Sequence, residues 1–443
     1  MRVIIVGSGA AAASAHDAIL SSEVRATVTL ISRESDEPYS KVALPKYISG
    51  QVDRAKAFLA RPAATRPDTG DARPEFTQLL GTTVVSIDRA ARTVLATGPT
   101  GRAEVPYEAL ILAVGATPSH RFGQPVWTLD DADRVKALVT EGKTAAVTGG
   151  GFLGLHMATA LIRAGMKVTV FERERQILPG RTPPRFADFL ETCMRKWGAS
   201  VHTAALIDSV RKAGDTWEVS VQVRGHAPET TGFDLCLDCT GMSPDVALAR
   251  DAGLRVCDRG ILVDTSQRTS DPSILAAGDC AAVAHTSGES RSAGLWHHAS
   301  VQGKVAGLVA VGVPAETPPS TGWHTFAVSC EGMAGTADSV PAMPRVACSF
   351  GDLVPREGDR VLESGEPGGD YRYAVVRGHR VSGYFQATEP SGLGGLIERL
   401  GETAAGLDLS VAGYPGPFSV ITAPQALAPD PGTGKVMVKG RKE

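Results

Sequence analysis

The sequence predicts an α/β fold made of two Rossmann-like units and a smaller C-terminal α+β domain. Two glycine-rich loops carry this prediction, because each one follows a short apolar strand and precedes a helix-favouring run. The loops lie about 140 residues apart in a chain of 443 residues. A Pro-rich segment, residues 313–320, separates this region from the C-terminal part of the chain.

The first loop follows an apolar strand predicted over residues 3–6. Gly7, Gly9 and Ala12 occupy the three positions of the glycine fingerprint. In this motif the first glycine makes a tight turn and the second lets the backbone approach a pyrophosphate. The third position packs helix against strand and tolerates alanine. The helix predicted over residues 10–20 would direct its N-terminal N–H groups at the phosphates.

The next strand, predicted over residues 26–31, should end beside the ribose of a bound nucleotide. Glu34 is the candidate acceptor for the ribose hydroxyls, and Ser32 occupies the other plausible place. Any single glycine loop also suits an ordinary strand–turn–helix. Two loops in the proper context favour two dinucleotides bound side by side.

The second loop repeats the motif without a substitution. Gly149, Gly151 and Gly154 follow a strand predicted over residues 145–148 and precede a helix predicted over residues 155–163. The sequence therefore predicts a second phosphate-binding helix N-terminus.

A further strand, predicted over residues 167–171, ends at Glu172, 23 residues after the first glycine of this loop. A carboxylate at that place suits hydrogen bonds to a ribose 2′-OH, which favours NAD over NADP. Arg173 and Arg175 follow directly and leave NADPH open, because either could meet a 2′-phosphate.

Composition fits an ordinary globular protein of two to three domains, with 43% apolar and 21% charged residues. The net charge of −3 predicts no broad basic field for nucleic acid. No apolar run reaches the roughly 18 residues that span a bilayer, so no membrane association is expected. The first residues lead straight into a strand, so no signal peptide is expected and the predicted location is the cytoplasm.

The seven cysteines are scattered, and their odd number without an export signal predicts reduced thiols. Cys236 and Cys239 form the only CxxC pair, within a segment that is typical of a strand, residues 233–241. Residues three apart on a strand point to opposite faces, so neither a redox disulfide nor a zinc site is expected there. No metal-binding motif appears, and no metal is predicted.

Three more segments resemble strands that end in small-residue turns. They are residues 107–118, which contain Ala113 and Gly115, residues 238–244, and residues 269–280, which end in Gly278, Asp279 and Cys280.

Together, these loops and segments resemble the two-dinucleotide flavoprotein reductases of the pyridine nucleotide–disulfide oxidoreductase superfamily, over roughly residues 1 to 310. Residues 38–46, Pro-Tyr-Ser-Lys-Val-Ala-Leu-Pro-Lys, look like the stretch beside the flavin ring in ferredoxin, rubredoxin and nitrite reductase flavoproteins. Other members carry a reactive cysteine in this region. This chain has none between Met1 and Thr192, so disulfide reduction at the flavin is not expected.

The resemblance implies a glutathione-reductase-type arrangement in which one domain is inserted into another. The expected domains are an FAD-binding domain at 1–120 and 245–320, an NAD-binding domain at 121–244, and a C-terminal interface domain at 321–443. The last would serve partner docking or a homodimer. Within it, residues 372–376 and 381–386 are typical of paired strands and residues 391–400 of a helix.

The resemblance also implies roles for single residues. FAD would be held by Gly7, Gly9, Ala12, Glu34, Lys41, Ala113, Gly115, Gly278, Asp279 and Gln302. NAD would be held by Gly149, Gly151, Gly154 and Glu172. The residues implied at the reacting rings are Lys41, Lys46, His156 and Trp296. Without the resemblance, the lysines would be interpreted as solvated surface and the tryptophan as core.

His156 departs from the family pattern. Many relatives carry a glutamate there, which lies against the nicotinamide and can pair with a lysine on the flavin side. Neutral imidazole cannot replace that carboxylate, and imidazolium would repel Lys41 or Lys46.

The predicted function is that of an FAD-dependent oxidoreductase. It takes hydride from NAD(P)H, with NADH favoured, and passes electrons to a small redox protein such as a ferredoxin or rubredoxin, or to a small molecule. Two alternatives stay open. One is a flavin oxidase or dehydrogenase that acts directly on a small metabolite, and the other is an NADH-sensing flavoprotein with little turnover.

Overall fold

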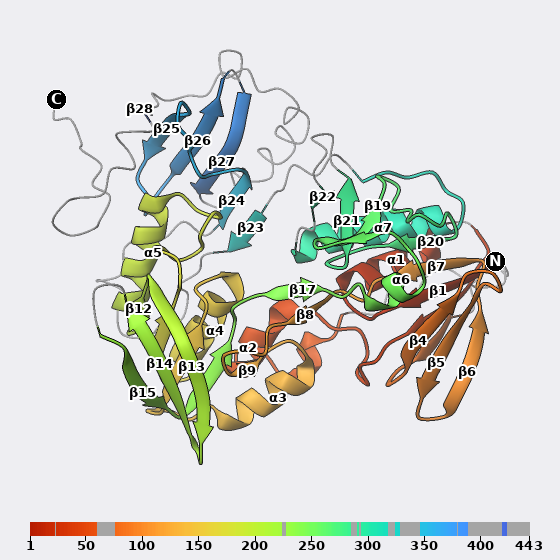
Figure 1. Ribbon diagram of the computed structural model, residues 1–443, viewed down its shortest axis with the longest axis horizontal. Helices are drawn as coiled ribbons and strands as arrows, with labels where there is room; N and C mark the ends of the chain where they lie inside the picture. The colour runs from red at the N-terminus through yellow and green to blue at the C-terminus, as the bar shows by residue number, and fades with distance from the viewer. Residues whose placement is uncertain are drawn as a thin grey trace.

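The computed structural model describes residues 1–22, 24–59, 76–223, 227–284, 290–291, 294–317, 324–327, 346–378, 380–388 and 419–422. They form a mixed α/β fold with two parallel sheets and a separate antiparallel sheet (Figure 1). The helices are α1 Ala10–Ser21, α2 Leu44–Ile48, α3 Leu129–Leu138, α4 Phe152–Arg163, α5 Pro184–Lys196, α6 Ala247–Asp251 and α7 Trp296–Ala310. The predicted α/β class is therefore confirmed.

The first sheet has five parallel strands in the order β20-β7-β1-β2-β3. Their bounds are β1 Arg2–Val6, β2 Thr27–Ile31, β3 Phe76–Leu79, β7 Ala109–Leu112 and β20 Ile274–Ala276. β20 follows the second glycine loop in the chain by more than a hundred residues yet pairs with β7, which is the pairing that an interleaved domain order requires.

Both faces of this sheet are covered, which is why β1 is apolar at successive positions. Val3 and Ile5 belong to a core shared with α1 and α7, whereas Ile4 and Val6 belong to a core on the other face. One antiparallel sheet, one mixed sheet in which β19 and β21 are parallel, and α6 cover that other face. Their strands are β4 Thr83–Asp88, β5 Thr93–Gly98, β6 Gly101–Pro106, β18 Val256–Cys257, β19 Gly260–Val263, β21 Ala281–Ala284 and β22 Ser290–Arg291.

The second sheet is also parallel, in the order β12-β11-β10-β16-β9. Its strands are β9 Gln124–Pro125, β10 Thr144–Thr148, β11 Lys167–Phe171, β12 Ser200–His202 and β16 Leu235–Asp238. An antiparallel ribbon packs on one face, formed by β13 Ala205–Ala213, β14 Thr216–Val223 and β15 Glu229–Phe233. Two short strands, β8 Ala116–Pro118 and β17 Met242–Pro244, pair with each other where the chain passes between the two units (Figure 1).

The C-terminal sheet is antiparallel, in the order β23-β24-β27-β26-β25-β28. Its strands are β23 His324–Ala327, β24 Val346–Gly351, β25 Arg360–Gly365, β26 Tyr371–Arg377, β27 Arg380–Thr388 and β28 Ser419–Thr422. β26 and β27 confirm the two strands predicted in this region. The helix predicted over residues 391–400 lies outside the described residues.

The cysteine pair lies at the end of β16. Cys236 is within the strand and buried, and Cys239 follows it. Both thiols are free, and burial raises the pKa of each well above the usual thiol value. Within the described ranges, no helix is both long and apolar enough to span a bilayer.

Candidate functional site

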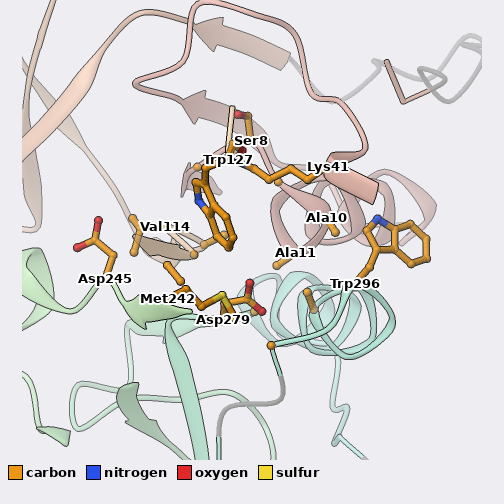
Figure 2. A pocket seen from close by; sticks show the side chains of 18 of the residues that line it. Ser8, Ala10, Ala11, Lys41, Val114, Trp127, Met242, Asp245, Asp279 and Trp296 are labelled. Atoms are coloured by element: carbon orange, nitrogen blue, oxygen red, sulfur yellow. Dashed lines mark hydrogen bonds between the residues drawn. The ribbon is translucent and has the colours of Figure 1, made fainter. Parts of the chain in front are cut away.

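A cavity of about 1030 Å³ lies where the strands of both parallel sheets end (Figure 2). Residues that follow β1, β7 and β20 line it from the first unit, and residues that follow β10 and β16 line it from the second. The carboxyl ends of parallel strands are the usual place for ligands in α/β proteins. Both predicted glycine loops therefore reach one shared space.

The first loop has the geometry of a phosphate cradle. Gly7 has a φ of +118°, and a Cβ there would lie 2.2 Å from the carbonyl oxygen of Ala113. Gly9 is the N-cap of α1 and lines the cavity, and a Cβ there would meet nothing within 4 Å. No side chain caps α1, so its first N–H groups are available to an anion in the cavity.

The second loop repeats this arrangement. Gly149 has a φ of +94°, and a Cβ there would lie 2.5 Å from the carbonyl oxygen of Cys239. Gly151 caps α4, lines the cavity and has open space at its Cβ position. A Cβ on Gly154 would come 1.9 Å from the Gly149 oxygen, whereas the matching Ala12 is accommodated fully buried. Only the second unit strictly needs glycine at the third position.

Backbone hydrogen bonds show where the second strand of each unit ends, at β2 in the first unit and at β11 in the second. The first glycine of each loop donates its N–H to the last residue of that strand, Ile31 in one unit and Phe171 in the other. The next residue is Ser32 in the first unit and Glu172 in the second. Glu34 lies two residues further on and also lines the cavity, so the register favours Ser32 over Glu34 as the ribose-facing candidate.

Glu172 is buried beneath the second loop. Its Oε2 accepts the N–H of Gly150 at 2.7 Å, and its Oε1 accepts the N–H of Glu174 at 2.8 Å. These bonds fix the carboxylate. Arg173 is largely exposed and pairs with Glu174, so it is turned away from the cavity.

The carboxylate of Glu34, unlike that of Glu172, is bound by side chains, those of Lys41 and Tyr39. The Lys41 ammonium donates to Glu34 Oε1 at 3.1 Å and to the carbonyl oxygen of Trp127 at 2.8 Å. The Tyr39 hydroxyl donates to Glu34 Oε2 at 2.5 Å. In Figure 2, Lys41 and Trp127 lie together on one side of the pocket and Asp279 on the other.

Gly278 and Asp279 follow β20 and line the cavity. Burial raises the pKa of Asp279, and the charge of Lys41 opposes that shift. Gln302 does not line the cavity: it is buried, and its Oε1 accepts the Gly278 N–H at 2.8 Å. Gln302 supports the Gly-Asp turn from behind, and its predicted contact with FAD stays a prediction.

Of the other residues expected at the site, some line the cavity and some do not. His156 and Trp296 line the cavity, and Lys46 is exposed outside it. His156 is exposed to the cavity, yet the protein around its ring lowers its pKa, and the charge of Lys46 lowers it further. Ala113 and Gly115 line the cavity, whereas Ala12, Gly149, Gly154 and Glu172 lie behind the lining.

Several lining residues were missed by the sequence analysis. Trp127 and Arg181 carry no local motif that could have revealed them. Met242 and Asp245 lie in or just after the segment 238–244, whose pattern predicts a strand and a turn but no role in a site. Asp245 accepts a 3.5 Å contact from Arg33, which joins the ends of two distant strands.

Comparison with known proteins gives consistent matches. The family model described as pyridine nucleotide-disulphide oxidoreductase matches residues 1–303. The NADH-dependent phenylglyoxylate dehydrogenase subunit epsilon of Aromatoleum evansii is 28% identical over 84% of this chain and 85% of its own length. The ferredoxin–NAD(+) reductase component of the anthranilate 1,2-dioxygenase system of Burkholderia cepacia is 33% identical over 62% of this chain and 67% of its own. The structure of a covalent putidaredoxin reductase–putidaredoxin complex has a TM-score of 0.76 at 22% identity, covering 94% of this chain and 96% of that one.

Proposed function

The chain belongs to the pyridine nucleotide–disulphide oxidoreductase family, and we propose that its cavity holds FAD along the first unit and NADH along the second. The protein is an FAD-dependent oxidoreductase whose electron donor is NADH. The observation that carries the arrangement is that both glycine loops open onto one cavity. The interleaved boundaries, 1–120 with 245–320 around 121–244, follow from the same proposal.

The residues around the cavity suit this pair of ligands. Gly9 and Gly151 leave open space at the starts of two uncapped helices, where a pyrophosphate would accept backbone N–H bonds. The Ser32 hydroxyl would face the ribose of FAD, and Asp279 would face its ribityl and pyrophosphate region. The ammonium of Lys41 would lie beside the isoalloxazine ring.

Hydride transfer from nicotinamide, followed by electron transfer to an acceptor, is the chemistry that FAD supplies when it is bound. The chain's own residues orient the two ligands and set the charge around them. A fixed cation such as Lys41 stabilises negative charge that develops on a neighbouring ring. The lowered pKa of His156 favours its neutral form, which adds no second positive charge beside Lys46.

Glu172 supports a preference for NADH. Its carboxylate is held by two backbone N–H groups and cannot turn away without breaking both bonds. A 2′-phosphate at this place would meet that fixed negative charge. For the acceptor we propose a small redox protein of the ferredoxin or rubredoxin class, with a small molecule as the alternative.

Anaerobic titration of the purified protein tests the function directly. We expect NADH to bleach the flavin absorbance at much lower concentration than NADPH, because of Glu172. Subsequent addition of an oxidised ferredoxin or rubredoxin should restore the flavin spectrum. A protein purified without flavin contradicts the proposal. Bound flavin that neither nucleotide bleaches points to direct oxidation of a metabolite.

Two matched variants assign the two ligands to the two loops. Gly9 and Gly151 have ordinary φ values of −78° and −79°, so a leucine at either position fits the backbone and fills cavity space. We expect Gly9→Leu to fold but lose FAD. Gly151→Leu should keep FAD and lose reduction by NADH. The opposite pattern, or flavin retained in both with unchanged NADH titration, would refute the assignment.

A further inference from the structure

The strongest feature outside the glycine loops is a chain of hydrogen bonds that holds one cation at the cavity. Lys41 and Glu34 both line the cavity, with side chains 35% and 20% exposed. Their 3.1 Å contact is therefore partly shielded from water, and it is stronger than a pair on the open surface.

We propose that Glu34 is a positioning residue: it fixes the Lys41 ammonium at the cavity, offsets part of its charge, and thereby sets the reduction potential of the bound flavin. The inference rests on the proposed function, because it requires FAD beside Lys41. It assigns Glu34 a role different from the ribose contact that the sequence predicted.

Lys41 is held from two sides. Glu34 accepts one N–H of the ammonium, and the carbonyl oxygen of Trp127 accepts another. The ammonium also lies 5.5 Å from the centroid of the Trp127 ring and 5.7 Å from that of Tyr39, within the range of cation–π attraction. These contacts leave one N–H of the ammonium to face a ligand.

Glu34 is itself fixed by Tyr39. The Tyr39 hydroxyl donates to Glu34 Oε2 and accepts the N–H of Leu129, so the hydroxyl hydrogen has a single direction. Burial, followed by the charge of Glu34, raises the pKa of Tyr39 far above its usual value. The hydroxyl therefore stays protonated and keeps donating over the whole working range of pH.

The charge of Lys41 acts across the cavity. It opposes the rise in the pKa of Asp279, which lines the cavity from the end of β20. Any group bound between these two residues lies in the field of the ammonium, and Glu34 weakens that field. The two charges thus have opposite effects on a ring that gains negative charge when it is reduced.

The second unit supplies a matched control. Glu174 is two residues beyond Glu172, as Glu34 is two beyond Ser32. Its side chain is half exposed, pairs with an exposed arginine and does not line the cavity. Removing its charge changes the protein's net charge by the same amount as at Glu34, without touching the cation at the cavity.

The test measures the reduction potential of the flavin in the purified flavin-bound protein by spectroelectrochemistry. We expect Lys41→Met to lower the potential and Glu34→Gln to raise it. Each shift should correspond to about a tenfold change in the equilibrium constant for reduction, about 30 mV for a two-electron couple. In the double variant, Glu34→Gln should add little to the effect of Lys41→Met, because Glu34 acts through the lysine.

Three outcomes overturn the inference. They are a potential that Glu34→Gln leaves at the wild-type value, a shift equal to that of Glu174→Gln, and shifts that add fully in the double variant. If Glu34→Gln does not retain flavin, Glu34→Asp replaces it, since it keeps the charge but withdraws the carboxylate by one methylene. Its potential should then lie above the wild type, and an unchanged value refutes the proposal. Wild-type protein that binds no flavin would refute the proposed function instead.

Discussion

One residue directly follows the second strand of each parallel sheet: Ser32 follows β2, and Glu172 follows β11. The side chain at this position distinguishes two otherwise similar units. Glu172 presents a fixed carboxylate at this place, whereas Ser32 presents a neutral hydroxyl 2.9 Å from that of Ser8. A carboxylate accepts hydrogen bonds from ribose more strongly than a hydroxyl does. A 2′-phosphate at this place would meet a fixed negative charge in the second unit, whereas the first unit has no such charge at the matching position.

His156 carries a prediction about pH. Its pKa lies below the ordinary histidine value, because of the surrounding protein and then the charge of Lys46. The midpoint of its protonation should therefore lie below pH 6.5. We expect an NMR titration of labelled histidine to show this, with His156→Gln to assign the signal.

Lys46→Met should raise the pKa of His156, since it removes one of the two causes of the shift. Lys56→Met, at another exposed lysine, is the control and should leave the titration unchanged. A His156 signal with an ordinary pKa, or one that responds equally to both lysine variants, would contradict the assignment.

At the scale of elements, α1 and α7 pack against each other through glycine. A Cβ on Gly303 would lie 2.1 Å from the carbonyl oxygen of Ala11, and one on Gly307 would lie 2.3 Å from that of Ala15. Both glycines face α1 one helical turn apart, so the two backbones approach closely. The start of α1, which carries the first phosphate cradle, is thus placed by α7.

Gly303→Ala should therefore push α1 away from α7. Overpacking of this kind costs about 1–3 kcal/mol, and we expect a lower midpoint of thermal unfolding together with weaker FAD retention. Lys304→Ala, at the next and exposed position of α7, is the control. An unfolding midpoint for Gly303→Ala that equals the control would show that the helices can separate without cost.

At the scale of the whole molecule, α5 joins the second unit to the C-terminal sheet (Figure 1). Phe186 is fully buried, with its ring centroid 4.7 Å from that of Phe385 and 6.0 Å from that of Tyr371. Next to it, Arg185 pairs with the buried Glu363 at 2.6 Å. The sheet and the second parallel sheet consequently share one continuous core.

Phe186→Ala should destabilise both parts together. Loss of a buried phenylalanine costs about 3–5 kcal/mol, and the shared core predicts a single unfolding transition at lower temperature in calorimetry. Thr192→Ala, on the exposed face of α5, should behave like the wild type. If only a fraction of the unfolding heat shifts, α5 does not couple the two regions.

The two strand–loop–helix units, the family and the strands β26 and β27 could all be predicted from the sequence. Each of these depends on contacts between residues that are close along the chain, so the local pattern carries the information. The glycines at 7, 149 and 154 are required by close backbone approach, which the motif already encodes.

How these units come together to form a site depends on contacts that arise when the whole chain is folded. The Lys41 ammonium meets the Trp127 oxygen across 86 residues of sequence, and no local motif predicts that contact. Whether Ser32 or Glu34 is the better candidate for the ribose contact depends on where β2 ends. The sequence pattern leaves the end of a strand uncertain by one or two positions. Contacts between distant segments are set by the packing of whole sheets and helices, and the single cavity beneath both glycine loops is a product of that packing.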